Sequence, residues 1–248
     1  MLSALIPRAP ALEREALVAC VVLLAGAAWL GLGFSTNSRL FHWHHLDSTT
    51  VASTAFLMVF VAGWTVMTVA MMLPSTLPVL LTLHTFAAQR SDRALLLGLA
   101  VLGYVLTWGM FGVLVYVGYL VQSPLHAGSV AVYGGPVMLI IAGAFQFSSL
   151  KHKCLEKCRS PFSFVMAHWQ GQGERWQAFR LGVDHGIFCV GCCWALMLLM
   201  FAVSVGSLTW MMVLAMVMAV EKTAPWGRRL STPLGIGLMG WGVMWLLV

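Results

Sequence analysis

A chain of 248 residues that is 60% hydrophobic and only 9% charged, with a mean hydropathy of +0.88, is too apolar for a soluble globular protein. It predicts one integral membrane domain over residues 1–248, an all-α polytopic bundle of transmembrane helices. The net charge of +6 does not indicate a nucleic-acid partner, because the positive-inside distribution of basic residues, described below, accounts for the excess of positive charge. Six cysteines in a chain of this length do not indicate a disulfide framework.

Hydrophobic runs predict seven transmembrane helices. They cover residues 16–33, 51–73, 94–121, 129–150, 183–205, 208–220 and 233–248. Gly134-Gly135-Pro136 is expected to interrupt the fourth of these helices. Between the fourth and the fifth, residues 151–182 are expected to form a polar cytoplasmic loop rich in Cys, His and basic residues.

The predicted loop after the first helix holds three imidazoles within four residues, at His42, His44 and His45. They can chelate a divalent ion if the loop folds back. A solvated interfacial loop would have the same composition. The loop is therefore a candidate for metal capture on the outer side of the membrane.

The second helix ends in a methionine-rich segment that contains proline. Met67 and Met71 lie four residues apart and share a helix face, and Met72 follows. Pro74 and Pro78 must bend or break the helix, which frees backbone carbonyls that other groups have to satisfy. Irregular backbone at membrane depth is tolerated where it is buried in protein or lines a cavity, so this break is a candidate wall of a site. Methionine as a gap-filling core residue is the alternative.

Cys154 and Cys158 lie in the polar loop at helical i, i+4 spacing, so that both thiols can face one partner. The surrounding Lys and Arg residues favour the thiolate, which is the form that binds metal or attacks a disulfide. A purely structural role is the alternative for this pair.

The motif around which the chain is organised lies at the start of the fifth helix. A helix turns about 100° per residue, which puts Cys189, Cys192 and Cys193 on one stripe with His185. Met200 continues this stripe further along the helix. Soft sulfur and imidazole donors on one face suit a Cu(I) or Zn(II) ion. The alternative is that cysteine serves as a small hydrophobic residue in a membrane helix.

Positive charge is unequally distributed between the predicted loops. With a cytoplasmic N-terminus, the inner segments hold 13 of the 14 Lys and Arg residues and the outer loops hold only Arg39. The positive-inside rule therefore predicts a cytoplasmic N-terminus and an external C-terminus. This orientation brings Met71, His185 and Glu221 into the cytoplasmic half of the membrane. An acidic residue there is costly and is a functional candidate, and a snorkelling charge helped by Lys222 is the alternative.

At these motifs the chain resembles a known family. The positions that carry the resemblance are Ala70-Met71-Met72-Leu73-Pro74-Ser75, Lys153-Cys154-Leu155-Glu156-Lys157-Cys158-Arg159-Ser160-Pro161, His168-Trp169, His185-Gly186, Cys189, Gly191-Cys192-Cys193-Trp194-Ala195-Leu196-Met197 and Glu221-Lys222. The family comprises bacterial membrane proteins of unknown function, described as predicted metal-binding integral membrane proteins and in part as copper chaperones. The resemblance covers roughly residues 60–245 and leaves out residues 1–50. It implies a multi-pass, metal-binding protein of the bacterial inner membrane.

The first functional hypothesis is a protein that binds a soft transition metal, with Cu(I) preferred and zinc as the second choice. It would deliver copper, as a chaperone or assembly factor, to a membrane metalloenzyme. Transport across the bilayer would need ligands staged through the whole membrane, so binding and delivery are favoured. The candidate ligands are His185, Cys189, Cys192, Cys193, Met71, Met72, Cys154 and Cys158, and the residues expected to support them or to line an ion path are Asp184, Glu221 and Met200.

Two other hypotheses remain open. The first is a membrane thiol-disulfide oxidoreductase that uses Cys189 and Cys192 with Cys154 and Cys158 as a partner pair. The second is a structural or assembly subunit of a membrane complex, in which the cysteines serve packing. The sequence has no nucleotide-binding loop, no Ser-His-Asp candidate and no HExxH motif, so no other catalytic chemistry is indicated.

Overall fold

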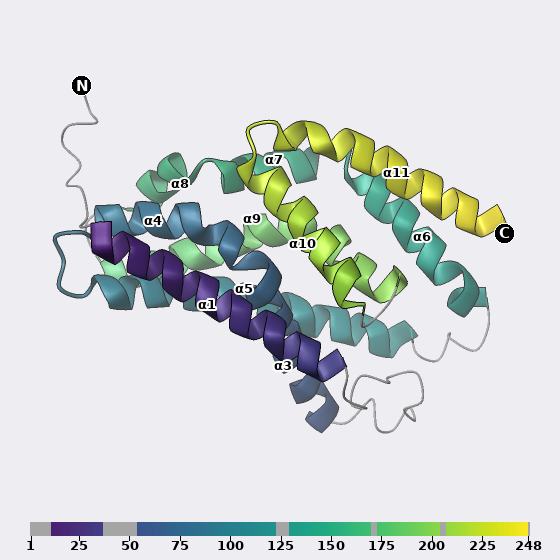
Figure 1. Ribbon diagram of the computed structural model, residues 1–248, viewed down its shortest axis with the longest axis horizontal. Helices are drawn as coiled ribbons and strands as arrows, with labels where there is room; N and C mark the ends of the chain where they lie inside the picture. Colours follow the sequence, from purple (N-terminus) through teal and green to yellow (C-terminus); the bar gives the residue numbers. More distant parts are fainter. Residues whose placement is uncertain (1–10, 37–53, 123–128, 170–172, 204–206, 248) are drawn as a thin grey trace.

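The computed structural model describes residues 11–36, 54–122, 129–169, 173–203 and 207–247, and all regular structure within these ranges is helical (Figure 1). The α-helices are α1 (Ala11–Thr36), α3 (Thr54–Met72), α4 (Leu77–Phe86), α5 (Arg93–Gln122), α6 (Ser129–Phe145), α7 (Ser149–Arg159), α8 (Pro161–His168), α9 (Glu174–Val203), α10 (Leu208–Thr223) and α11 (Gly227–Leu247), and one 3-10 turn, η4 (Pro74–Thr76), separates α3 from α4. The predicted all-α class is confirmed.

Five of these helices are long and apolar enough to cross a membrane, namely α1, α3, α5, α9 and α11. A sixth span arises if α6 and α7, which meet at an angle of 64°, form one broken span. Helix α10 has 16 residues and is about 24 Å long, less than the roughly 30 Å of a bilayer's hydrocarbon core. The chain is thus a helical membrane protein with five or six candidate spans, while the count of seven stays a prediction.

Helix α9 lies at the centre of the bundle (Figure 1). Helix α5 packs along it, and α6 and α7 contact it on other sides. Helices α1, α3 and α5 pack successively on one another, and α11 covers α6. A residue on α9 can therefore meet side chains from several helices at once.

Glycines on α9 allow the close approach of α5. A Cβ atom at Gly182 would lie 1.9 Å from the carbonyl oxygen of Ala100, and one at Gly186 would lie 2.7 Å from Cβ of Thr107. Small residues four positions apart are the usual way in which membrane helices pack closely. The Gly182/Gly186 pair thus fixes the contact between the two longest helices of the described chain.

The break predicted at Pro74 is present. Helix α3 ends at Met72, and the freed carbonyls are satisfied locally, because Ser75 Oγ donates to Met72 O and Thr76 Oγ1 donates to Leu73 O, each at 2.7 Å. The chain then re-enters a helix at Leu77. The segment between α3 and α4 is therefore irregular backbone whose carbonyl groups are satisfied inside the protein.

The structure differs from the sequence-based prediction in the region of α6 and α7. Helix α6 continues through Pro136 because α11 packs along it, and the bend comes only after Phe145. Residues 151–182, predicted as a loop, contain most of α7, all of α8 and the first turns of α9. Ser148 caps α7 by accepting a hydrogen bond from the Lys151 backbone N–H at 3.1 Å, and burial of one face of α7 stabilises it.

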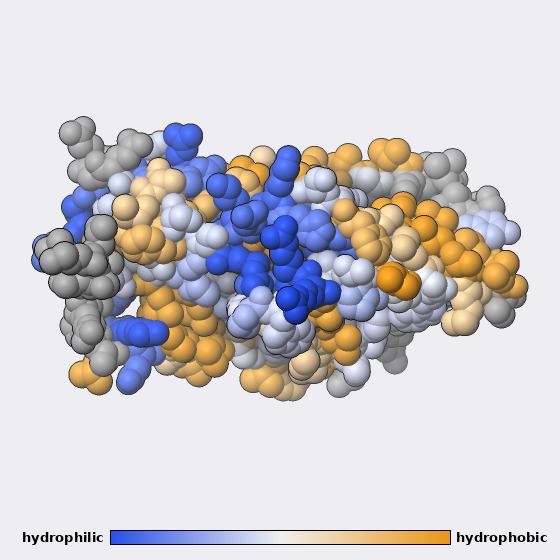
Figure 2. Space-filling view, turned by 90° about the horizontal axis from the view of Figure 1, so that it is seen from above, coloured by the Kyte–Doolittle hydropathy of each residue, from blue (hydrophilic) through white to orange (hydrophobic). Residues whose placement is uncertain are grey.

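Helix α7 is amphipathic. Its inner face carries the buried Cys154 and Cys158, while Lys153 and Lys157 are exposed. Figure 2 shows polar side chains gathered over the middle of this side of the molecule, above α7 and the α10–α11 turn, with apolar surface on either side of this patch. Exposed cations are costly in hydrocarbon, so this face meets water or lipid headgroups.

Charged residues mark one end of the bundle. Arg90 pairs with Glu174 and Arg93 pairs with Glu13, which ties the starts of α1, α5 and α9 together. The hydrogen bond from Arg90 also lowers the pKa of Asp92. Helix α11 ends at the opposite end (Figure 1). The start of α1 and the end of α11 thus lie apart, and which end faces the cytoplasm stays a prediction.

We expect Gly182→Ala to lower the free energy of unfolding by about 1–3 kcal/mol or more, because the added methyl forces α5 away from α9. Gly98→Ala on α5 is the matched control, since a Cβ there meets nothing within 4 Å and alanine favours a helix. Denaturant unfolding in detergent, followed by circular dichroism, measures both. A Gly182→Ala variant as stable as the wild type would contradict this packing.

Candidate metal centre

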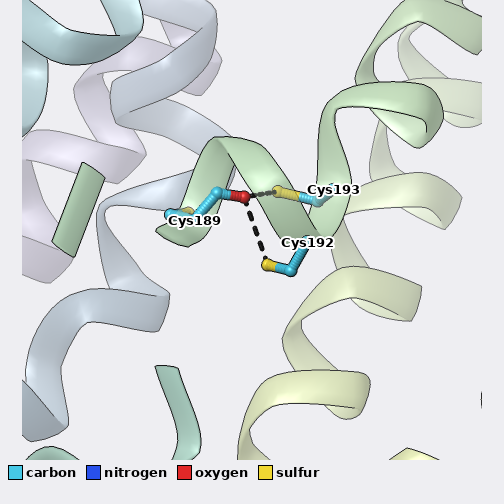
Figure 3. A group of neighbouring side chains, drawn as sticks. All are labelled: Cys189, Cys192 and Cys193. Atoms are coloured by element: carbon cyan, nitrogen blue, oxygen red, sulfur yellow. Dashed lines mark hydrogen bonds between the residues drawn. The ribbon is translucent and has the colours of Figure 1, made fainter. Parts of the chain in front are cut away.

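Three buried thiols form the centre of the site. Cys189, Cys192 and Cys193 come from successive turns of α9, and their sulfur atoms all lie within 4.8 Å of one another. They are only 1–2% exposed. The thiols of Cys192 and Cys193 both donate to the backbone carbonyl of Cys189, at 3.1 and 2.8 Å (Figure 3). We call these residues the thiol triad. Their helical spacing, read from the sequence, is what brings them together.

A thioether and a fourth thiol lie against the triad. Met72 Sδ, at the end of α3, is 3.8 Å from Cys193 Sγ. Cys158 of α7 is buried beside Cys192. Helix α7 approaches this closely because residue 191 is glycine, where a Cβ would lie 2.6 Å from Cys154 Sγ. Cys154 thus packs on the backbone of α9, whereas Cys158 meets the triad.

A lysine that was not among the predicted site residues lies in the same site. The amino group of Lys222, on α10, lies 3.0 Å from Cys189 Sγ, 3.3 Å from Met72 Sδ and 3.2 Å from Ser75 Oγ. Lys222 is 7% exposed. The rule that flagged Glu221, that an ionisable residue within a span is functional by default, applies equally to its neighbour Lys222 and would have found it.

Tyr104 and His185 complete the surroundings of Cys189. The Tyr104 hydroxyl is 3.1 Å from Cys189 Sγ, and no pattern in the sequence pointed to it. The His185 ring stacks on Tyr104 with 5.6 Å between centroids, and Phe164 lies at the same distance. His185 is buried and its Nδ1 has no hydrogen-bond partner. Its nitrogens are not part of the closely spaced donor group, so the structure places it beside the triad.

Glu221 faces α7 and α11. Both of its carboxylate oxygens lie 2.8 Å from the Lys151 amino group, and Ser231 Oγ donates to it at 2.8 Å. Lys151 also donates to Gln146. Arg159 donates to the backbone carbonyl of Glu221 at 2.5 Å, so these contacts fix α7 to the α10–α11 junction.

Of the remaining predicted residues, the structure describes Asp184, Met71 and Met200. Asp184 accepts a hydrogen bond from His168 at 2.9 Å and is partly exposed. Met71 and Met200 are buried in the same core cluster as the triad. His42, His44 and His45 lie outside the described residues.

Glu221→Gln leaves the Lys151 ammonium buried without a counter-charge, and we expect it to lower the free energy of unfolding by about 3–5 kcal/mol. The double variant Lys151→Met/Glu221→Met should recover most of this loss, since it buries no charge. Glu156→Gln, on the exposed face of α7, serves as control and should change stability by less than about 0.5 kcal/mol. If Glu221→Gln unfolds like the control in a detergent denaturation series, the pair does not hold α7 in place.

Comparison with known proteins agrees with this chemistry. Residues 61–245 match the sequence model of a family described as "PpoB2: Copper chaperone". No curated protein and no solved structure matches the chain. The matched stretch covers about three quarters of the chain and includes the thiol triad, Met72, Cys158 and Lys222. On this evidence the chain belongs to the PpoB2 copper chaperone family.

Proposed function

We propose that this protein binds Cu(I) at the thiol triad and delivers it to a metalloenzyme of the bacterial inner membrane. The observation that carries the proposal is the spacing of three buried sulfurs, all within 4.8 Å of one another. A single ion placed between them can contact all three after small side-chain rotations. Membership in a copper chaperone family names the same metal.

The donor set favours Cu(I) over harder ions. Thiolate and thioether ligands are soft and select Cu(I), for which two or three sulfurs suffice. Met72 Sδ offers a thioether next to Cys193. Zinc would need a closed tetrahedral set, for which Cys158 or His185 would have to move to the triad as a fourth ligand.

The position of the site favours delivery over pumping. Sulfur donors from α3, α7 and α9 gather at one place in the bundle. Helix α7 has buried cysteines on one face and exposed lysines on the other, so that an ion reaching the triad from the polar face passes α7. A displacement of α7 from Gly191 would open this route, and a partner that docks on the polar face would receive the ion there.

One contact favours a second candidate, the thiol-disulfide oxidoreductase. Cys158 lies beside Cys192, which brings together the two cysteine pairs that this function would use. In such a reaction, two of these thiols would form a disulfide while an external disulfide is reduced to two thiols. The attacking thiolate must be accessible, however, and the Cys158, Cys189 and Cys192 side chains are all buried.

Elemental analysis of protein purified in detergent without oxygen tests the proposal. We expect about one copper per chain after loading with Cu(I), and loss of that copper when Cys189, Cys192 and Cys193 are all changed to Ser. Cys20→Ser is the matched control, because Cys20 is an exposed cysteine on α1, and it should retain the copper.

Other results would contradict copper delivery. Stoichiometric zinc in place of copper would show that the protein binds zinc and would contradict the assignment of copper. If no metal is bound and a thiol pair titrates with redox buffers, the oxidoreductase is favoured. If neither metal nor a redox-active thiol pair is found, the assembly subunit is the hypothesis that remains.

A further inference from the structure

Lys222 brings a positive charge into direct contact with the proposed copper ligands. Its amino group has three neighbours at hydrogen-bonding distance, namely Cys189 Sγ, Met72 Sδ and Ser75 Oγ. A lysine ammonium has three donors and no acceptor. The three acceptors around the Lys222 nitrogen therefore correspond to the three donors of its charged, ammonium form.

The position of this charge is fixed by the neighbouring residues. Lys222 follows Glu221, whose carboxylate pairs with Lys151, and Arg159 donates to the backbone carbonyls of Glu221 and Ala224. The end of α10 is thus anchored on both sides of Lys222. Because Lys222 is buried, water and salt screen its charge only weakly.

We propose that Lys222 is a specificity-determining residue that favours a monovalent soft ion over a divalent one at the thiol triad. This inference rests on the proposed function. The repulsion between an ammonium and a bound cation is proportional to the charge of the cation, so a divalent ion is repelled twice as strongly as Cu(I). Two thiolates, one ammonium and one monovalent ion also sum to zero, the arrangement that costs least in a low-dielectric interior.

The ratio of two affinities isolates this effect. A change in the ease of ionising the thiols affects both metals alike, and cancels in the ratio, where both metals bind the same number of thiolates. Removal of the ammonium, by contrast, strengthens the binding of a divalent ion more than that of a monovalent one. At contact distances such as these, we expect a change in the ratio of about ten- to a hundredfold.

The experiment measures the dissociation constants of Cu(I) and Zn(II) by competition with chelators, without oxygen, for the purified wild type and four variants. Lys222→Gln and Lys222→Met remove the charge. Ser75→Asp keeps Lys222 and places a carboxylate against the same ammonium, so that it tests the charge even if the lysine variants fold poorly. Lys153→Gln removes an exposed lysine of α7 and is the matched control.

We expect the preference for Cu(I) over Zn(II) to fall about tenfold or more in Lys222→Gln, Lys222→Met and Ser75→Asp, and to stay within about twofold of the wild type in Lys153→Gln. If the wild type binds Cu(I) and the preference is unchanged in Lys222→Gln or Ser75→Asp, the inference about Lys222 is wrong and the proposed function is unaffected. A wild type that binds no Cu(I) would overturn the proposed function and this inference with it.

Discussion

An ammonium group buried among helices is tolerated only where the surrounding structure supplies acceptors for its protons, and this constraint acts twice at the end of α10. Glu221 and Lys222 are adjacent in sequence and therefore point about 100° apart around the helix. Glu221 meets Lys151 of α7 and Ser231 of α11, whereas Lys222 meets Met72 of α3 and Cys189 of α9. Each buried charge costs several kcal/mol unless these contacts are kept. The arrangement of five helices around the thiol triad depends on both.

Two features of the backbone make these contacts possible. The break at Pro74 ends α3 at the depth of the triad and turns Ser75 Oγ toward Lys222. Gly191 lets α7 approach α9, which brings Cys158 to Cys192. Irregular backbone is tolerated inside a membrane protein where it is buried and its polar groups are satisfied. The two features thus supply, from different helices, the thioether and the fourth thiol beside the triad.

The sequence predicted the parts of the site that follow from local geometry. The spacing of the three thiols on a helix is enough to place them together, and Pro74 is enough to predict the break beside Met72. Lys222 was missed although the rule on ionisable residues within a span applies to it, and Tyr104 was missed because its role comes from helix adjacency, which no local pattern encodes. His185 shares the stripe of Cys189, but a shared stripe does not bring an imidazole to a thiol cluster, since the ring here stacks on Tyr104. The helical character of residues 151–182 was also missed, since the burial that stabilises α7 is a tertiary contact.

In the proposed function, a copper ion is held by the sulfurs of the triad. X-ray absorption at the copper edge, on wild-type protein loaded with Cu(I) in detergent without oxygen, tests it most directly. We expect a Cu(I) edge and a first coordination shell of two or three sulfur atoms with no nitrogen or oxygen ligand. A shell dominated by nitrogen or oxygen would place the copper elsewhere in the chain and contradict the assignment.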